Sequence, residues 1–192
     1  LAGQVEVGHA EDGHGRLRSR ESRHFPPPGP VAANRAGAWD NAGMDELAQP
    51  PVLESQAVRL RPLRADDAGA VFALYSDPAV CRYWSFAPWT ELAQAEAWLA
   101  ERMGWRPPTT YGWALAEPGD DRLVGTVSLF ALSAPNRRAE LGYSLLPARQ
   151  GRGLAREGVR LALAYGFGAL GLERVEADVD PRNGPSWRLL EH

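Results

Sequence analysis

The spacing of apolar and polar residues predicts five strands in this chain. The stretch "VRLRPL" from Val58 alternates apolar and polar residues, as a strand with one buried face does. The links "PGDD" and "SAPN" later in the chain are rich in turn residues and predict antiparallel hairpins between the strands they join. The other four alternating stretches are Tyr111 to Glu117, Leu123 to Leu132, Arg138 to Leu146 and Arg174 to Val179.

Apolar residues at helical spacing predict four helices. The first begins near Asp66 and Asp67, whose charges suit the positive end of a helix, and it ends at Asp77-Pro78. The second opens at Thr90, whose hydroxyl can cap it, and runs to about Met103. The remaining two are expected at Leu154 to Phe167 and from Ser186 to His192.

The order of these elements predicts a mixed α/β fold, with a mostly antiparallel central sheet flanked by helices, over residues 53–192. Residues 1–52 combine Gly, Pro, Arg, His and Ala without apolar periodicity and include "PPPGP". Such a segment buries too little apolar surface to offset the entropy of ordering it. We therefore predict a disordered N-terminal extension.

Composition limits the possible partners. The chain has 192 residues, of which 44% are hydrophobic, and this suits one domain with an extension. The net charge of -3 gives no reason to expect nucleic acid or an anionic membrane as a partner. One cysteine, Cys81, cannot form an intramolecular disulfide, and no targeting segment is evident, so we expect a cytoplasmic protein.

The basic residues exclude several classes of enzyme. Every one of them is arginine, so the chain has no Walker-type phosphate loop, no Schiff-base lysine and no lysine base. The four histidines lie near the two ends of the chain, which argues against a catalytic triad in the folded part and leaves no metal-ligand spacing. These are His9, His14, His24 and His192.

A glycine-rich turn, "LLPARQGRGLARE", joins a predicted strand to a predicted helix. The free amides at the start of a helix attract phosphate groups. Gly151 and Gly153 allow close approach of the backbone and a positive φ, while Arg149 and Arg152 add positive charge. The turn therefore predicts a pyrophosphate site, and the alternative is an ordinary turn with solvated arginines.

The sequence resembles the GCN5-related N-acetyltransferase (GNAT) superfamily. Residues 150–155, "QGRGLA", fit the acetyl-CoA signature Gln/Arg-x-x-Gly-x-Gly/Ala at every fixed position. The stretches "VRLRPLRADDAGAVFALYSDPAVCRYW", "GYSLLPARQGRGLARE" and "VDPRNGPSWRLLE" resemble the branch that includes ribosomal-protein N-terminal acetyltransferases. The resemblance covers about Val52 to the C-terminus and implies the acyl-CoA N-acyltransferase fold, with acetyl-CoA as acyl donor.

The resemblance implies a set of cofactor-binding residues. Backbone amides around Leu145 and Leu146 would bind the pantetheine arm, and a bulge in that strand would aim an amide at the thioester carbonyl. Asn183 and Ser186 match the family's Asn-x-x-Ser at the start of a helix beside the thiol. The pyrophosphate would be bound by Gln150, Gly151, Arg152, Gly153, Leu154 and Ala155.

Two residues are candidates for catalysis by direct attack of an amine on the thioester. Glu140 shares a strand face with Gly142 and Ser144 and is the candidate base, acting through a water; the alternative is an exposed glutamate or a partner for Arg138. Ser186 is the candidate to protonate or hydrogen-bond the thiolate, or it caps a helix. Tyr143 is a weaker alternative acid.

The sequence says less about the residues that bind the amine acceptor. Trp84, Phe86 and Trp89, with Arg82, belong to the linker "AVCRYWSFAPW", which is either a hydrophobic plug between two helices or a lip facing the substrate. The lip is compatible with a peptide N-terminus or a small amine. No acidic cluster is evident in the sequence, so nothing there favours a polycationic acceptor.

The chain departs from the family at "RLLEH", where relatives continue with two more strands. The strand at 174–179 would then expose an edge, which predicts a poorly soluble, marginally stable or strand-swapped chain, with a homodimer or strand exchange as the way to cover it. The expected function is an acetyl-CoA-dependent N-acetyltransferase. The alternatives are a CoA-binding module or fragment without turnover and an unrelated nucleotide-binding α/β protein.

Overall fold

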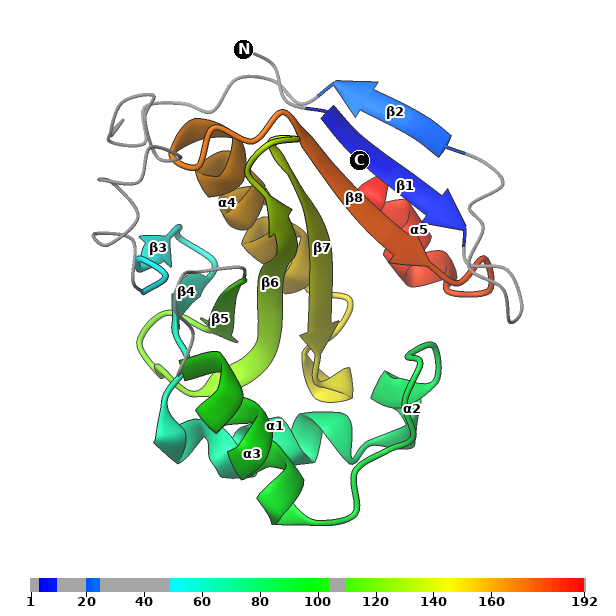
Figure 1. The fold of residues 1–192 in the computed structure, drawn as a ribbon. Helices are drawn as coiled ribbons and strands as arrows, with labels where there is room; N and C mark the ends of the chain where they lie inside the picture. Colours follow the sequence, from blue (N-terminus) through cyan, green and yellow to red (C-terminus); the bar gives the residue numbers. More distant parts are fainter. Residues whose placement is uncertain (1–3, 10–19, 25–48, 104–109, 192) are drawn as a thin grey trace.

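The computed structural model describes residues 4–9, 20–24, 49–103 and 110–191. One sheet crosses the molecule in the order β2-β1-β8-β7-β6-β5-β4-β3 (Figure 1). Its strands are β1 (Gln4–His9), β2 (Arg20–His24), β3 (Leu53–Glu54), β4 (Arg59–Pro62), β5 (Tyr111–Ala116), β6 (Leu123–Ser133), β7 (Arg138–Leu145) and β8 (Arg174–Val179). The helices are α1 (Ala68–Tyr75), α2 (Pro78–Cys81), α3 (Leu92–Met103), α4 (Leu154–Gly168) and α5 (Gly184–Leu190), with 3-10 turns η2 (Ala65–Asp67) and η3 (Pro147–Arg149).

The pairing of the strands confirms the expected mixed α/β fold. Strands β3 to β7 pair with one another in antiparallel order, and the "PGDD" and "SAPN" links form the turns of the β5–β6 and β6–β7 hairpins. Strand β8 runs parallel to β7, because α4 lies between the two in the chain. The six strands β3 to β8 make a mostly antiparallel sheet flanked by helices.

Two layers of apolar side chains pack on the two faces of the sheet. On one face α4 contributes buried residues such as Val159 and Leu163 to a cluster with residues of β4 to β8. Gly158 lets α4 lie close to the sheet, because an added Cβ would be 2.6 Å from Leu115 Cδ1. On the other face α1 and α3 form a second cluster around Leu74 and Leu99. None of the helices in the described ranges is long and apolar enough to cross a membrane.

Several helix ends differ from the expectation; α5, for example, begins at Gly184 and not at Ser186. Asp77-Pro78 ends α1 as predicted but also begins α2, because the Asp77 carboxylate accepts from the Ala79 amide at 2.8 Å. The second long helix begins at Leu92, and the Gln94 side chain accepts from the amides of Thr90 and Glu91 at 2.8 and 3.0 Å. The cap is therefore the Gln94 amide oxygen rather than the expected Thr90 hydroxyl.

Two strands lie in the part of the chain where no regular structure was expected. Strand β1 pairs parallel with the whole of β8, from Gln4↔Arg174 to His9↔Val179, and β2 pairs antiparallel with β1. The exposed edge expected at β8 is therefore covered within the chain (Figure 1). Val5 and Val7 alternate with Gln4 and Glu6, but this pattern is too short to identify a strand in a segment without further periodicity. Most of the remaining segment 1–52, with "PPPGP", lies outside the described residues.

Shortening the chain to residues 49–192 should increase self-association. Beyond Glu176, β8 would then lose its remaining strand partner, because its pairing with β7 ends there and β1 would be absent. Unpaired edges promote pairing with other chains. Light scattering during gel filtration should detect dimers or larger species of the short chain at concentrations where the full chain is a monomer. A monomeric short chain with an unchanged melting temperature would contradict this prediction.

Candidate active site

Strands β7 and β8 separate in the middle of the sheet. They pair only from Arg138↔Arg174 to Glu140↔Glu176, although β7 continues to Leu145 (Figure 1). The pairing of β7 with β8 thus ends five residues before β7 itself does. A length of the β7 edge therefore faces the gap toward β8 rather than a paired strand.

The backbone of β7 decides which amides face that gap. The Leu146 amide donates to the Val124 carbonyl of β6 at 2.9 Å. Because backbone groups of successive strand residues point to opposite sides, the amides of Leu145 and Tyr143 face β8. The Leu145 carbonyl accepts from the Gln150 side chain at 3.0 Å. Of the two expected pantetheine contacts, the structure directs the amide of Leu145, and not that of Leu146, toward the gap.

The bulge that the resemblance implies is absent from the β6–β7 ladder. Pairing runs without a shift from Gly125↔Leu145 to Phe130↔Glu140, and the irregularity lies between Phe130 and Ser133. The two strands approach closely at Gly125 because it has no Cβ. A Cβ there would lie 2.4 Å from the Ser144 carbonyl oxygen. The irregularity next to Gly125 lies instead in the β5–β6 ladder, between Leu115 and Ala116.

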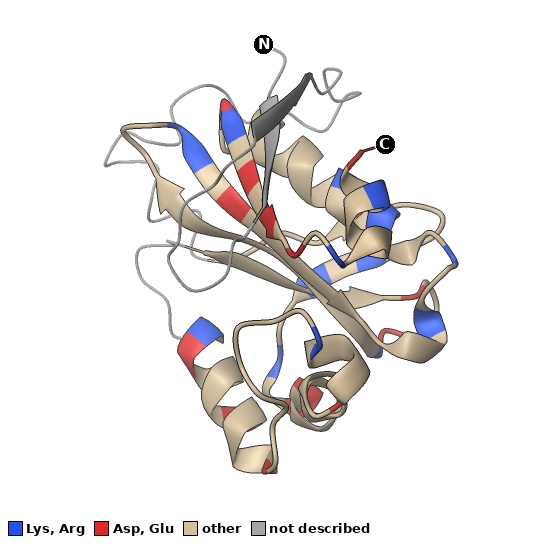
Figure 2. Cartoon of the chain, turned by 90° about the vertical axis from the view of Figure 1, so that its right-hand side faces the viewer, with Lys and Arg blue, Asp and Glu red and all other residues tan. Residues whose placement is uncertain are grey.

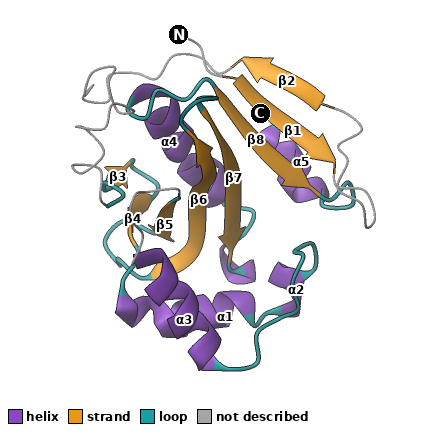
Figure 3. Cartoon of the chain, in the orientation of Figure 1, coloured by secondary structure: helices purple, strands orange, loops and turns teal. Residues whose placement is uncertain are grey.

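The glycine turn after β7 has the predicted backbone geometry. Gly151 and Gly153 have φ angles of 75° and 77°, and Gly153 is the residue before the first turn of α4. The first amides of α4 have no acceptor within the helix, so they point out of its N-terminus. Figure 3 shows this connection at the C-terminal end of β7. The Leu154 side chain is buried in the core, so only its backbone can contact a phosphate group.

The arginines of the turn are already ion-paired. Arg149 Nε lies 2.6 Å from Glu117 Oε2, and Arg152 Nη2 lies 2.8 Å from Glu117 Oε1. Glu117 follows β5, far from the turn in sequence, and the sequence pattern gave no signal of this contact. The expected excess of positive charge at the turn is therefore partly neutralised.

Carboxylates gather where β7 and β8 begin to separate. Glu140 pairs in register with Glu176, and Asp178 follows two residues later on the same face of β8. Figure 2 shows acidic and basic positions side by side on these neighbouring strands. Burial, then the charges of Asp178 and Glu176, raise the pKa of Glu140, and Arg138 partly opposes them. The sequence did not reveal this cluster because its members lie on different strands.

The other face of β7 carries a pair of hydroxyl groups. The Tyr143 hydroxyl lies 2.6 Å from Ser186 Oγ, and burial raises the pKa of Tyr143 to about 12. Asn183 caps α5, because its side chain accepts from the Ser186 amide at 3.3 Å. Ser186 is thus a hydroxyl beside Tyr143 rather than the cap of the helix, and Asn183 fixes the start of α5.

Aromatic side chains from the linker surround Tyr75 of α1. The Tyr75 hydroxyl is 2.9 Å from Thr126 Oγ1 on β6, a contact that the sequence did not suggest. Trp84 is 39% exposed, so the linker combines packed aromatic residues with an exposed one. The ring centroids of Trp84, Phe86, Trp89 and Trp98 lie 4.9–6.1 Å from that of Tyr75. The packing around Tyr75 agrees with a hydrophobic plug, and the lip that faces the substrate stays a prediction.

Comparisons with known proteins agree with this arrangement. Residues 57–192 match the family model described as "Acetyltransferase (GNAT) domain". The chain is 35% identical over 147 residues to YoaA, an uncharacterized N-acetyltransferase of Bacillus subtilis (strain 168), covering 73% of this chain and 80% of the relative. It is 29% identical over 129 residues to spermidine N(1)-acetyltransferase of Escherichia coli (strain K12), covering 67% of each.

A solved structure shares the fold. The Vibrio cholerae spermidine N-acetyltransferase in complex with CoA and spermine aligns with a TM-score of 0.64 and 23% identity, covering 71% of this chain and 79% of that one. The resemblance seen in the glycine turn thus extends over most of the described chain. The chain belongs to the GNAT superfamily and is an acetyl-CoA-dependent N-acetyltransferase.

Proposed function

We propose that residues 53–192 form the domain that transfers the acetyl group of acetyl-CoA to a primary amine by direct attack. One observation carries the proposal. Where β7 leaves β8, it presents Glu140 on one face and Tyr143, bonded to Ser186, on the other. A base and an acid on opposite sides of one strand suit an amine that attacks the thioester carbonyl from one side and a thiolate that leaves on the other.

The donor site is built from backbone groups. Acetyl-CoA supplies the activated thioester when bound. The amides of Gly151 to Ala155 are the proposed pyrophosphate contacts. The positive φ angles of Gly151 and Gly153 shape the turn so that these amides lie at the N-terminus of α4. The Gln150 side chain fixes the end of β7 through the Leu145 carbonyl, which leaves the Leu145 amide as the proposed pantetheine contact. Asn183 orders the start of α5 beside them.

Glu140 and Ser186 are the proposed base and acid of the transfer. Glu140, with its pKa raised, accepts a proton from the attacking ammonium group through a water. Ser186 donates a hydrogen bond or proton toward the departing sulfur, and its hydroxyl is held by Tyr143 at 2.6 Å. The Tyr143 hydroxyl supports Ser186 by hydrogen bonding and keeps its own proton, because burial raises the pKa of Tyr143 to about 12.

The acceptor is proposed to be a cationic primary amine, either a peptide N-terminus or a small amine. Glu140 and Asp178 present carboxylates near the gap, and Trp84 presents an exposed aromatic ring. The Glu176 carboxylate is ion-paired with Arg138 and Arg174, at 3.1 and 2.9 Å. Two relatives in the comparison act on spermidine by name, which makes spermidine the first small amine to test. The narrower resemblance to ribosomal-protein N-terminal acetyltransferases makes a ribosomal N-terminal peptide the second. We place the reaction in the cytoplasm, since Cys81 is a buried free thiol.

Replacing Gly153 with tryptophan should weaken CoA binding at least about tenfold. The substitution forces a side chain onto a φ of 77°, and its Cβ meets nothing within 4 Å, so the ring has room to cover the helix amides without disturbing the core. Calorimetric titration of the full chain with CoA measures the effect. A CoA affinity equal to that of the unmodified chain would refute the proposed pyrophosphate site.

Gly119→Trp is the matched control. Gly119 also has a positive φ, of 88°, and open space around its Cβ, but it lies in the β5–β6 turn. The Gly119→Trp chain should bind CoA with the same affinity as the unmodified chain. CoA binding without release of free thiol in the presence of any tested amine would favour the CoA-binding module over the enzyme.

A further inference from the structure

We propose that Glu117 is a positioning residue for the cofactor turn, acting through Arg149 and Arg152. The inference rests on the proposed pyrophosphate site at Gly151 to Ala155. It assigns to a residue of the β5–β6 turn a role in acetyl-CoA binding that neither the motif nor the resemblance indicates. Glu117 itself is not proposed to touch the cofactor.

The geometry of the contact supports this role. The two carboxylate oxygens of Glu117 are ion-paired with different arginines. Oε2 lies 2.6 Å from Arg149 Nε, and Oε1 lies 2.8 Å from Arg152 Nη2. The Glu117 side chain is only 22% exposed, whereas that of Arg152 is 53% exposed. A partly buried carboxylate therefore links the β5–β6 turn to Arg149 at the end of η3 and to Arg152 between the two glycines.

The turn needs such a link because of its own sequence. Arg152 stands between two glycines that both have positive φ, and glycine loses more conformational freedom on ordering than any other residue. The glycines have no side chain with which to fix the turn, so its apex is held through Arg152. Loss of the carboxylate would leave the turn to be ordered when the cofactor binds, at a cost in affinity.

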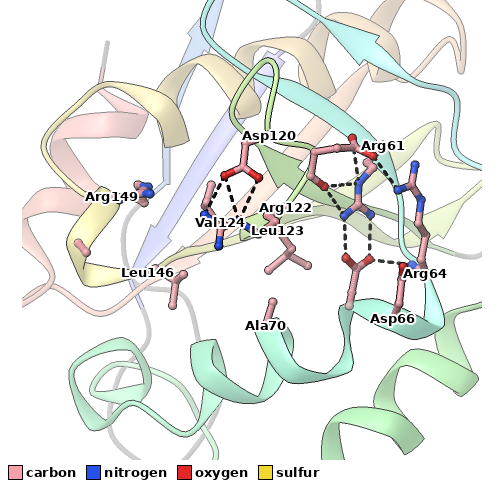
Figure 4. Close-up of a pocket in the computed structure, with 13 residues that line it drawn as sticks. Arg61, Arg64, Asp66, Ala70, Asp120, Arg122, Leu123, Val124, Leu146 and Arg149 are labelled. Atoms are coloured by element: carbon pink, nitrogen blue, oxygen red, sulfur yellow. Dashed lines mark hydrogen bonds and ion pairs between the residues drawn. The ribbon is translucent and has the colours of Figure 1, made fainter.

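Water reaches this cluster, which limits the size of the effect. Arg149 lines a pocket of about 590 Å³ between α1, the β5–β6 turn and η3, and Figure 4 shows its side chain at one side of that pocket. Ion pairs open to water are weakened by salt. The contribution of Glu117 should therefore be larger at low ionic strength than at high ionic strength.

The test is CoA binding by the full chain carrying Glu117→Gln. We expect CoA affinity to fall about threefold to tenfold at low salt, and less in high salt, as expected for a partly exposed ion pair. Glu117→Asp should restore part of the loss. The effect should be absent when Arg149→Gln and Arg152→Gln are already present, because Glu117 acts through these arginines.

Asp120→Asn is the control, since Asp120 pairs with Arg122 in the same turn at 2.8 Å and touches neither arginine of the cofactor turn. It should leave CoA affinity unchanged. Equal affinity of Glu117→Gln and the unmodified chain would overturn the inference while leaving the proposed site intact. Tighter binding by Glu117→Gln would also overturn it, by showing that Glu117 competes with phosphate. Failure of the unmodified chain to bind CoA would refute the proposed site itself.

Discussion

Glu140→Gln should lower kcat/KM about 10²- to 10³-fold, the usual contribution of a general base. Glutamine keeps the shape of the side chain but cannot accept the proton of the amine. Because burial and the charges of Asp178 and Glu176 raise the pKa of Glu140, activity of the unmodified enzyme should rise with pH through a value above about 4.3, the ordinary glutamate pKa. This rise should disappear in the variant. Initial rates of thiol release across pH measure both effects.

Asp178→Asn tests the effect of a neighbouring charge on the pKa of Glu140 without changing Glu140 itself. The Asp178 charge raises the pKa of Glu140, so its removal should move the rise in activity to lower pH while leaving the maximal rate nearly unchanged. CoA affinity should be unaffected in Glu140→Gln, because the proposed donor contacts come from the turn and from β7 backbone. A Glu140→Gln variant that retains full activity with an unchanged pH profile would exclude Glu140 as the base.

The elements were predictable where a local pattern determines them. The strand at 174–179 and the start of α4 at Leu154 agree with the structure to the residue, because alternation and a glycine before the helix are local signals. The positive φ angles of Gly151 and Gly153 were predictable for the same reason. The motif places the cofactor turn because all of its backbone groups come from one continuous stretch.

Contacts between distant segments were not predictable from one sequence. Glu117 meets the cofactor turn, and Glu176 meets Glu140, only after β5 to β8 have assembled. Strand β1 carries only a short alternation at Val5 and Val7, and nothing local shows that it pairs with β8, far away in the chain. The Leu146 amide was assigned to the cofactor from the motif, yet its direction depends on which carbonyl of β6 it meets.

The β5–β6 turn is itself fixed by a buried ion pair. Arg61 of β4, only 2% exposed, donates two hydrogen bonds to Asp67, at 2.7 and 2.8 Å, and two more to the Asp121 carbonyl. A further donor goes to the Pro62 carbonyl, so every N–H of the guanidinium has an acceptor. Figure 4 shows this network at one end of the pocket. It connects η2 and β4 to the turn that carries Glu117.

Asp67→Ala should therefore destabilise the fold by about 3 kcal/mol, the lower end of the range for a broken buried pair, because Arg61 keeps only the Asp121 carboxylate, whose Oδ1 lies 3.3 Å from its Nε. Urea unfolding at constant pH measures the loss. Replacing both residues together, as Arg61→Met with Asp67→Leu, should recover much of it, because no unpaired charge remains in the core. Glu173→Ala, which removes the exposed partner of Arg137, should cost about 1 kcal/mol or less. If Asp67→Ala costs no more than Glu173→Ala, the pair does not hold the β5–β6 turn in place.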